Sequence, residues 1–169
     1  MELIDIGLVN SIMVGANGPQ GERAFMLQAR SEDQVVTVLL EKQQVAELSS
    51  QLRRLLQGLA ATFPGTEPSP AADKLEVDLP SDAEPDFRAR AVRVGFEPTE
   101  RLLQLEFFEY PGQDDQSLPD EGIVLRCLAT VDMVHAMSGH ALNVVNQGRP
   151  LCPYCRFPLV DDHRCPAVN

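Results

Sequence analysis

Four residues near the C-terminus carry the side chains that most often bind zinc in proteins. Cys152 and Cys155 are separated by two residues, and His163 and Cys165 follow after a short loop. Thiolate and imidazole ligands at such spacing typically form a tetrahedral Cys3His site, in which the protein fills every position around the metal. Such a site leaves no place for a reacting water molecule. The pattern therefore predicts one structural Zn²⁺ per chain and does not by itself predict a reaction.

Three other interpretations of this segment compete with zinc. Cys-Pro-Tyr-Cys is also the active-site tetrapeptide of glutaredoxins, but that chemistry needs a helix after the first cysteine, which Pro158 disfavours. A set of disulfides is disfavoured because the segment holds an odd number of cysteines. The last alternative is a tail that binds nothing. The ligand spacing, with Pro153 and Pro166 in positions that suit tight turns, favours zinc.

The composition limits the classes of partner. The 169 residues carry a formal net charge of −11, whereas binding to nucleic acid or to an anionic membrane relies on Lys and Arg that neutralise phosphate. We therefore expect neither partner. No apolar run approaches the ~20 residues of a membrane span. Residues 1–5 are acidic where a signal peptide would be basic, so we expect a cytoplasmic protein.

The pattern of apolar residues predicts an α+β fold built from two similar halves. In each half, three strands precede one helix whose apolar side chains recur every three or four residues. The strands are expected at 3–14, 22–30 and 35–41 and at 87–96, 101–110 and 122–129, and the helices from 43 to Gly58 and at 131–146. Cys127, in the last strand, is expected to be a small buried hydrophobic residue.

Similar residues at matching positions in the two halves indicate a tandem βββα duplication, although two amphipathic units could resemble each other by chance. The matched residues are Val14, Gly15, Pro19, Glu22, Arg23 and Leu27 against Val94, Gly95, Pro98, Glu100, Arg101 and Leu105, and on the helices Val45, Leu48 and Leu55 against Val134, Met137 and Val144. Each unit is too small to bury its apolar face alone. We expect the two to form an antiparallel sheet system with both helices on one side.

These patterns divide the chain into four segments. Residues 1–60 and 87–147 are the two units, 61–86 is a proline-rich linker, and 148–169 is a zinc-knuckle tail. Within the linker, Leu75, Val77 and Leu79 alternate with other residues and could add a short strand.

The repeated body and the tail together resemble an uncharacterised actinobacterial family of small proteins, classed only as a domain of unknown function. The resemblance rests on the ending Cys-Pro-x-Cys…His-x-Cys-Pro, here Cys152, Pro153, Cys155, His163, Cys165 and Pro166, preceded by Gly148, Arg149 and Pro150. It covers the whole chain and implies no activity. Arg156 stands where such knuckles commonly carry glycine, so its backbone is expected to need a positive φ.

An enzymatic site would have to come from a few scattered residues. Arg88, Arg90 and Arg93 could receive an anion in a cleft between the repeats, with His135 or His140 as an acid–base group. The simpler interpretation is a solvated strand face whose arginines pair with carboxylates, and histidines without a catalytic partner. No phosphate-binding loop, nucleophile elbow or His-Glu-x-x-His motif is present.

The acidic segment 110–122 contains four carboxylates that could bind calcium. Asp114, Asp115, Asp120 and Glu121 lack the spacing of an EF-hand, however. We therefore interpret this segment as a solvated surface loop.

The function that this pattern favours is a non-catalytic protein-interaction or scaffold module with a structural zinc. Tyr154, Phe157, Leu159 and Val160 surround a metal turn that is too small to bury them all. A rigidly held aromatic side chain suits a binding surface, for an unidentified protein partner or for a second copy in a homodimer. The alternative is an enzyme, or a binder of an anionic small molecule.

Overall fold

The computed structural model describes residues 1–19, 21–114, 117–147, 152–156 and 163–167. Within these ranges the chain forms two four-stranded sheets and two α-helices, so the fold is α+β. In chain order the elements are β1 (Glu2–Leu8), β2 (Ser11–Asn17), β3 (Ala24–Arg30), β4 (Val35–Leu40), α1 (Lys42–Thr62), the 3-10 helix η1 (Pro70–Lys74), β5 (Phe87–Arg88), β6 (Ala91–Glu97), β7 (Leu102–Phe108), β8 (Ile123–Thr130) and α2 (Val131–Asn146).

The order of the strands shows that each sheet takes one strand from the other half of the chain. One sheet has the order β1-β8-β7-β6 and the other β2-β3-β4-β5. In each sheet three consecutive strands are antiparallel, and the added strand, β1 or β5, pairs in parallel. The prediction of purely antiparallel sheets is therefore wrong. Sequence periodicity describes a strand's faces but carries no information about a partner strand that is distant in the sequence, as Ile123 is from Glu2 and Phe87 is from Val38.

Two corners of the fold connect the sheets. At each corner one residue donates its backbone N–H to one sheet and the next residue donates to the other. These four bonds, of 2.7–3.0 Å, run from Val9 to Leu128, from Asn10 to Arg30, from Ala89 to Leu39 and from Arg90 to Phe108. The single strands predicted at 3–14 and 87–96 are therefore each two strands, β1 with β2 and β5 with β6. The apolar pattern does not reveal the change of sheet because both sheets face one core.

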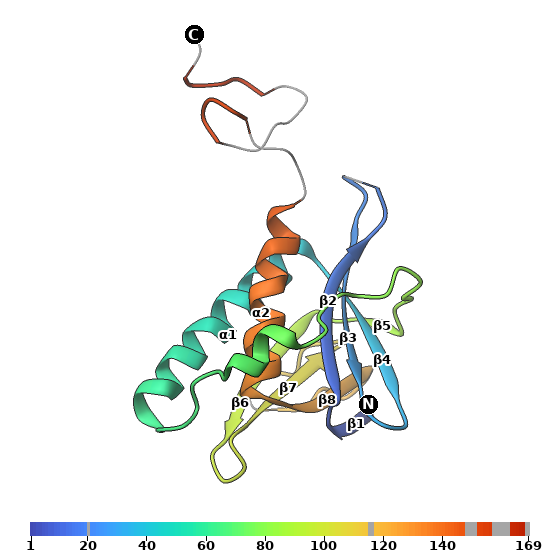
Figure 1. Ribbon diagram of the computed structural model, residues 1–169. Helices are drawn as coiled ribbons and strands as arrows, with labels where there is room; N and C mark the ends of the chain where they lie inside the picture. Colours follow the sequence, from blue (N-terminus) through green and yellow to red (C-terminus); the bar gives the residue numbers. More distant parts are fainter. Residues whose placement is uncertain (20, 115–116, 148–151, 157–162, 168–169) are drawn as a thin grey trace.

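The core lies between the sheets and the helices and forms one cluster that includes residues of both halves. The two helices pack against each other on one side of the strands (Figure 1). Where they touch, Ser49 and Ser138 are both fully buried, and the Ser49 hydroxyl donates a hydrogen bond to the Ser138 carbonyl oxygen. Small side chains at this contact let the helix backbones approach closely.

The ends of the helices have identifiable causes. α2 covers the predicted residues, and its first turn is capped by the Thr130 side chain, which accepts from Met133 N–H. α1 continues past Gly58, the end that its sequence predicts, to Thr62, and Phe63 after it has an extended backbone. Phe63 precedes Pro64, and a residue before proline is pushed into an extended conformation.

In the described residues no helix is both long and apolar enough to cross a bilayer.

The segment between the halves packs on the body. Ala72 and Thr66 are buried, and the short strand expected around Leu75, Val77 and Leu79 is not formed. Instead, Leu79 lies against β2, where a Cβ atom on Gly15 would come within 2.5 Å of the Leu79 Cβ. Glycine at that position therefore makes room for the linker. The segment covers a sheet face rather than adding to a sheet edge.

Cys127 lies in β8 with no exposed surface, as predicted. Burial raises the pKa of its thiol to about 12. At pH 8 such a pKa leaves on the order of one thiolate in ten thousand, and the thiolate is the reactive form.

We expect a thiol reagent to label Cys152, Cys155 and Cys165 in chelator-treated protein and to reach Cys127 only after unfolding. Rapid labelling of four thiols in the native protein would contradict this burial.

The exchange of β1 and β5 between the halves predicts how separate fragments of the chain behave. Because each half contributes a strand to the sheet of the other, residues 1–81 and 82–169 should not fold separately and should form native structure when mixed. The measurement is near-UV circular dichroism and backbone NMR of each fragment and of the mixture. A fragment that folds alone with dispersed amide signals would show that the exchanged strands are dispensable.

Candidate metal centre

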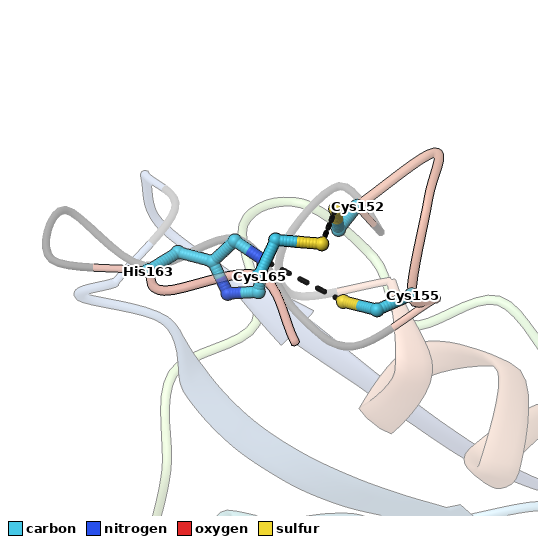
Figure 2. Close-up of side chains that lie close together, drawn as sticks. All are labelled: Cys152, Cys155, His163 and Cys165. Carbon is cyan, nitrogen blue, oxygen red and sulfur yellow. Dashed lines mark hydrogen bonds between the residues drawn. The ribbon is translucent and has the colours of Figure 1, made fainter. Parts of the chain in front are cut away.

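The four predicted ligands converge in the tail. The ligand atoms of Cys152, Cys155, His163 and Cys165 all lie within 4.8 Å of one another. Their side chains point toward a common centre from two turns of the chain (Figure 2). Within the described ranges this is the one group of three or more Cys, His, Asp or Glu side chains gathered closely enough to hold a metal.

Two of the separations between ligand atoms match those expected around a tetrahedral zinc ion. The two sulfur atoms of Cys152 and Cys165 are 3.7 Å apart, and the Cys155 sulfur is 3.6 Å from Nε2 of His163. Zn–S bonds of ~2.3 Å and Zn–N bonds of ~2.0–2.1 Å at tetrahedral angles place sulfur atoms ~3.8 Å apart and sulfur ~3.6 Å from nitrogen. A disulfide would bring two sulfurs to ~2.05 Å, and no disulfide joins these cysteines. The donor set therefore fits a metal such as zinc.

Hydrogen bonds around Cys152 favour the thiolate form of its side chain. Cys152 is buried, and the amide N–H of Arg156 donates to its carbonyl oxygen at 2.9 Å, which closes the turn between the first two ligands. Hydrogen bonds from the backbone amides of Cys155 and Tyr154, and further bonds from the His163 and Cys155 side chains, lower the pKa of the Cys152 thiol to about 6. The thiolate, which these bonds favour, is the form that binds metal.

Arg156 has the backbone conformation that its position in the knuckle predicts. Its φ is +64°, in the left-handed region that glycine adopts most easily. The turn after Cys155 thus has the positive φ that was expected there, although an arginine occupies the position.

The tail also carries an exposed aromatic side chain. Tyr154 lies between the first two ligands and keeps 71% of its surface exposed, the largest fraction among the exposed large hydrophobic residues of the described chain. Phe157, Leu159 and Val160, which the sequence groups with it, lie outside the described residues.

The three arginines considered for an anion each have a neighbour in the body. Arg88 pairs with Glu41 at 3.7 Å, Arg90 lies over the ring of Tyr110, and Arg93 contacts Glu106 at 3.4 Å. Arg93 Nη2 also donates to the Ser117 carbonyl oxygen. These contacts favour the interpretation of a strand face paired with carboxylates and aromatic rings.

The two histidines of α2 are not brought to those arginines by any described contact. His140 Nε2 lies 3.4 Å from an oxygen of Asp78 in the linker segment. His135 lies at a cavity of about 190 Å³ between the helices, beside Arg53 and Pro68. The sequence gives no reason to single out Arg53, because a cation on an exposed helix face is common.

The acidic loop shows no calcium site among its described residues. Asp114 accepts a hydrogen bond from the backbone N–H of Ser117, and the Asp120 carbonyl oxygen accepts one from the N-terminal amine. Asp115 lies outside the described residues.

A row of charges crosses one sheet, and the sequence pattern did not predict it. Glu106 is buried in β7 between Arg93 on β6 and Arg126 on β8, and Arg126 also reaches Asp5 on β1 at 3.8 Å. The four residues occupy paired positions in neighbouring strands, so their charges alternate across the sheet. Only the strand register could have revealed this row, and the periodicity of single strands does not supply it.

Comparison with known proteins gives a family without an assigned activity. A family model described as "Protein of unknown function (DUF3090)" matches residues 5–165, which include both helices, all four candidate ligands and every strand except the start of β1. No curated protein and no solved structure matches the chain. Since the match covers nearly its whole length, the chain belongs to this family of unknown function.

Proposed function

We propose that this protein is a non-catalytic interaction module whose tail is held by one structural Zn²⁺ and presents Tyr154 to a protein partner. The observation that carries the proposal is the Cys3His cluster, whose separations of 3.6 and 3.7 Å match tetrahedral zinc. Four protein ligands would fill that tetrahedron. A zinc ion there would fix the turn and would have no open position for substrate.

Tyr154 supports the choice of a protein partner. A tyrosine has few rotatable bonds and combines an apolar ring with a polar hydroxyl, and tyrosines are enriched at the centres of interfaces. Its place between two ligands would hold its backbone rigid, so little entropy would be lost on docking. The net charge of −11 supports a protein rather than nucleic acid or anionic lipid. Three thiols in the tail that form no disulfide suit a reducing compartment such as the cytoplasm.

We also infer that the body arose by tandem duplication of a βββα unit. Support comes from β2-β3-β4-α1 and β6-β7-β8-α2, which have the same order and the same antiparallel pairing. Two matched pairs occupy register positions, Val14 opposite Leu27 and Val94 opposite Leu105. On this account the body is a symmetric scaffold that carries the tail.

The proposed zinc site predicts the metal content of the protein and of a ligand variant. Purified protein should contain one zinc per chain, and Cys152→Ser should lose it because one ligand is missing. The body should stay folded in this variant, with unfolding free energy changed by less than about 1 kcal/mol, since its core does not include the tail ligands. Elemental analysis and thermal unfolding measure the two effects.

A control variant tests the turn at the same site. Arg156→Gly removes no ligand and relieves a positive φ, so it should retain zinc at equal or higher affinity. Native protein without metal, with a disulfide inside the cluster, would refute the zinc site. Loss of all cooperative unfolding in Cys152→Ser would instead show that the metal holds the body together.

The proposed binding surface predicts which variants keep a protein partner. Tagged full-length protein should capture a partner from native lysate that a chain ending at residue 147 does not capture. Tyr154→Ala should weaken the purified complex by roughly 2 kcal/mol, about thirty-fold, as truncation of an interface tyrosine commonly does. The matched control is Tyr110→Ala, because Tyr110 is the other tyrosine of the chain and lies in the body. Affinity is measured by calorimetry.

Each outcome of this comparison is informative. Equal recovery of partners by both chain lengths would reject the tail as the binding surface. A complex made of two copies of this chain, lost in Tyr154→Ala, would identify the partner as a homodimer. Turnover or binding of a small anionic compound by the shortened chain would favour the enzyme alternative.

A further inference from the structure

A groove of about 810 Å³ separates the first strand from the start of β4. Its walls are residues 2–5 of β1 on one side and residues 33–36 on the other, and Asp86 and Ile123 also line it. This volume lies within the range of ~300–1,000 Å³ that is typical of ligand sites. The groove is in the body and shares no residue with the metal centre, so a ligand could bind there whether or not the tail holds zinc.

One wall of the groove is an unpaired strand edge. β1 is the edge strand of its sheet and is bonded to β8 on one side only. The Glu2 N–H donates to the Gly122 carbonyl oxygen on that side. Since successive residues of a strand direct their backbone groups to opposite sides, Leu3 and Asp5 direct theirs away from β8 and toward the groove. No described backbone group accepts or donates there.

The opposite wall is a second edge. β5 contains two residues, and its pairing with β4 continues only to Thr37, whose backbone exchanges hydrogen bonds with Asp86. By the same alternation, Val35 directs its backbone groups to the β5 side, where no strand is present among the described residues. Two unpaired edges therefore border one groove.

Apart from Gln34, the side chains that line the groove are acidic or apolar. Four carboxylates line it, those of Glu2, Asp5, Asp33 and Asp86, and no lysine or arginine does. Asp5 is 3.8 Å from Arg126, and Asp86 accepts from Thr37 N–H, so these two are already engaged. Glu2 and Asp33 are exposed and have no described partner.

Two exposed apolar side chains complete the surface. Leu3 keeps 39% and Val35 53% of its surface exposed, one from each wall. An apolar side chain of a bound segment would cover both. Surfaces that combine exposed strand edges with apolar residues are usually protected, because they invite pairing with another chain.

We propose that this groove binds an extended, positively charged segment of a partner protein, which adds as a strand to β1. Backbone hydrogen bonds to Leu3 and Asp5 would give affinity, as in other cases of β-strand addition. Lysine or arginine side chains of the segment would meet Glu2 and Asp33, and aliphatic ones would cover Leu3 and Val35. A second copy of this chain fits less well, because two β1 edges would oppose their own acidic residues.

The test begins with selection of random ten-residue peptides displayed on phage against the full-length protein. The enriched peptides should carry net positive charge, alternate basic with aliphatic residues and lack proline in the binding run, because proline cannot donate to a strand. Their affinity should fall steeply as salt rises. Enrichment of acidic or proline-rich peptides would contradict the proposal.

Charge reversal identifies the site. For the enriched peptides, the double variant Glu2→Lys with Asp33→Lys should raise Kd at least ten-fold. The matched control, Glu22→Lys with Glu47→Lys, makes the same change in net charge at exposed positions away from the groove and should leave affinity within two-fold. If both double variants lose the same affinity for the peptides, the effect comes from overall charge, and the groove is not the binding site.

Hydrogen exchange shows whether a strand is formed. Peptide binding should slow amide exchange of Leu3, Asp5 and Val35 at least ten-fold while Tyr154 in the tail is unaffected. Protection confined to other residues would place the site elsewhere and refute the proposal. An unliganded protein that dimerises in ultracentrifugation, and loses the dimer in Leu3→Lys, would make a second copy the occupant instead.

Discussion

The two corners at Val9–Asn10 and Ala89–Arg90 hold the rest of the structure in place. At each corner, adjacent amides bond to different sheets, so a single extended stretch of chain belongs to both. This arrangement leaves β1 beside β8 and β5 beside β4, and it brings both sheets against one apolar cluster with the two helices. Neither half of the chain has a complete sheet without the other. The buried contact of Ser49 with Ser138 joins the two helices of this shared core.

Much of the body follows from local chemistry, and the part that does not depends on distant pairing. The amphipathic pattern of α2 and the apolar runs of β3, β4, β7 and β8 could be recognised in the sequence because these elements are largely buried in the core. The sheet that β1 and β5 join could not be predicted, because it depends on pairing with β8 and β4, which are distant from them in the sequence. Likewise Pro64, rather than Gly58, ends α1, because a glycine inside a helix costs less than about 1 kcal/mol, whereas proline clashes with the preceding turn.

The clustering of the four candidate ligands was predicted residue by residue because these residues are close in sequence. Spacing alone indicated that Cys152, Cys155, His163 and Cys165 could meet, and even the positive φ of Arg156 was anticipated from the turn. The acidic groove between β1 and β4 could not be found in that way. Its walls come together only because the corners place the first strand opposite the start of β4, and its carboxylates are unremarkable in an acidic chain.

The central claim, that both halves form one cooperative body, is tested most directly by native-state hydrogen exchange of the full-length protein in increasing denaturant. Leu27 in the sheet of β2–β5 and Leu105 in the sheet of β6–β8 and β1 are both fully buried. We predict that their amides exchange through a single global opening, with the same free energy and the same dependence on denaturant. Two separate openings, with one sheet exchanging while the other stays protected, would contradict the account.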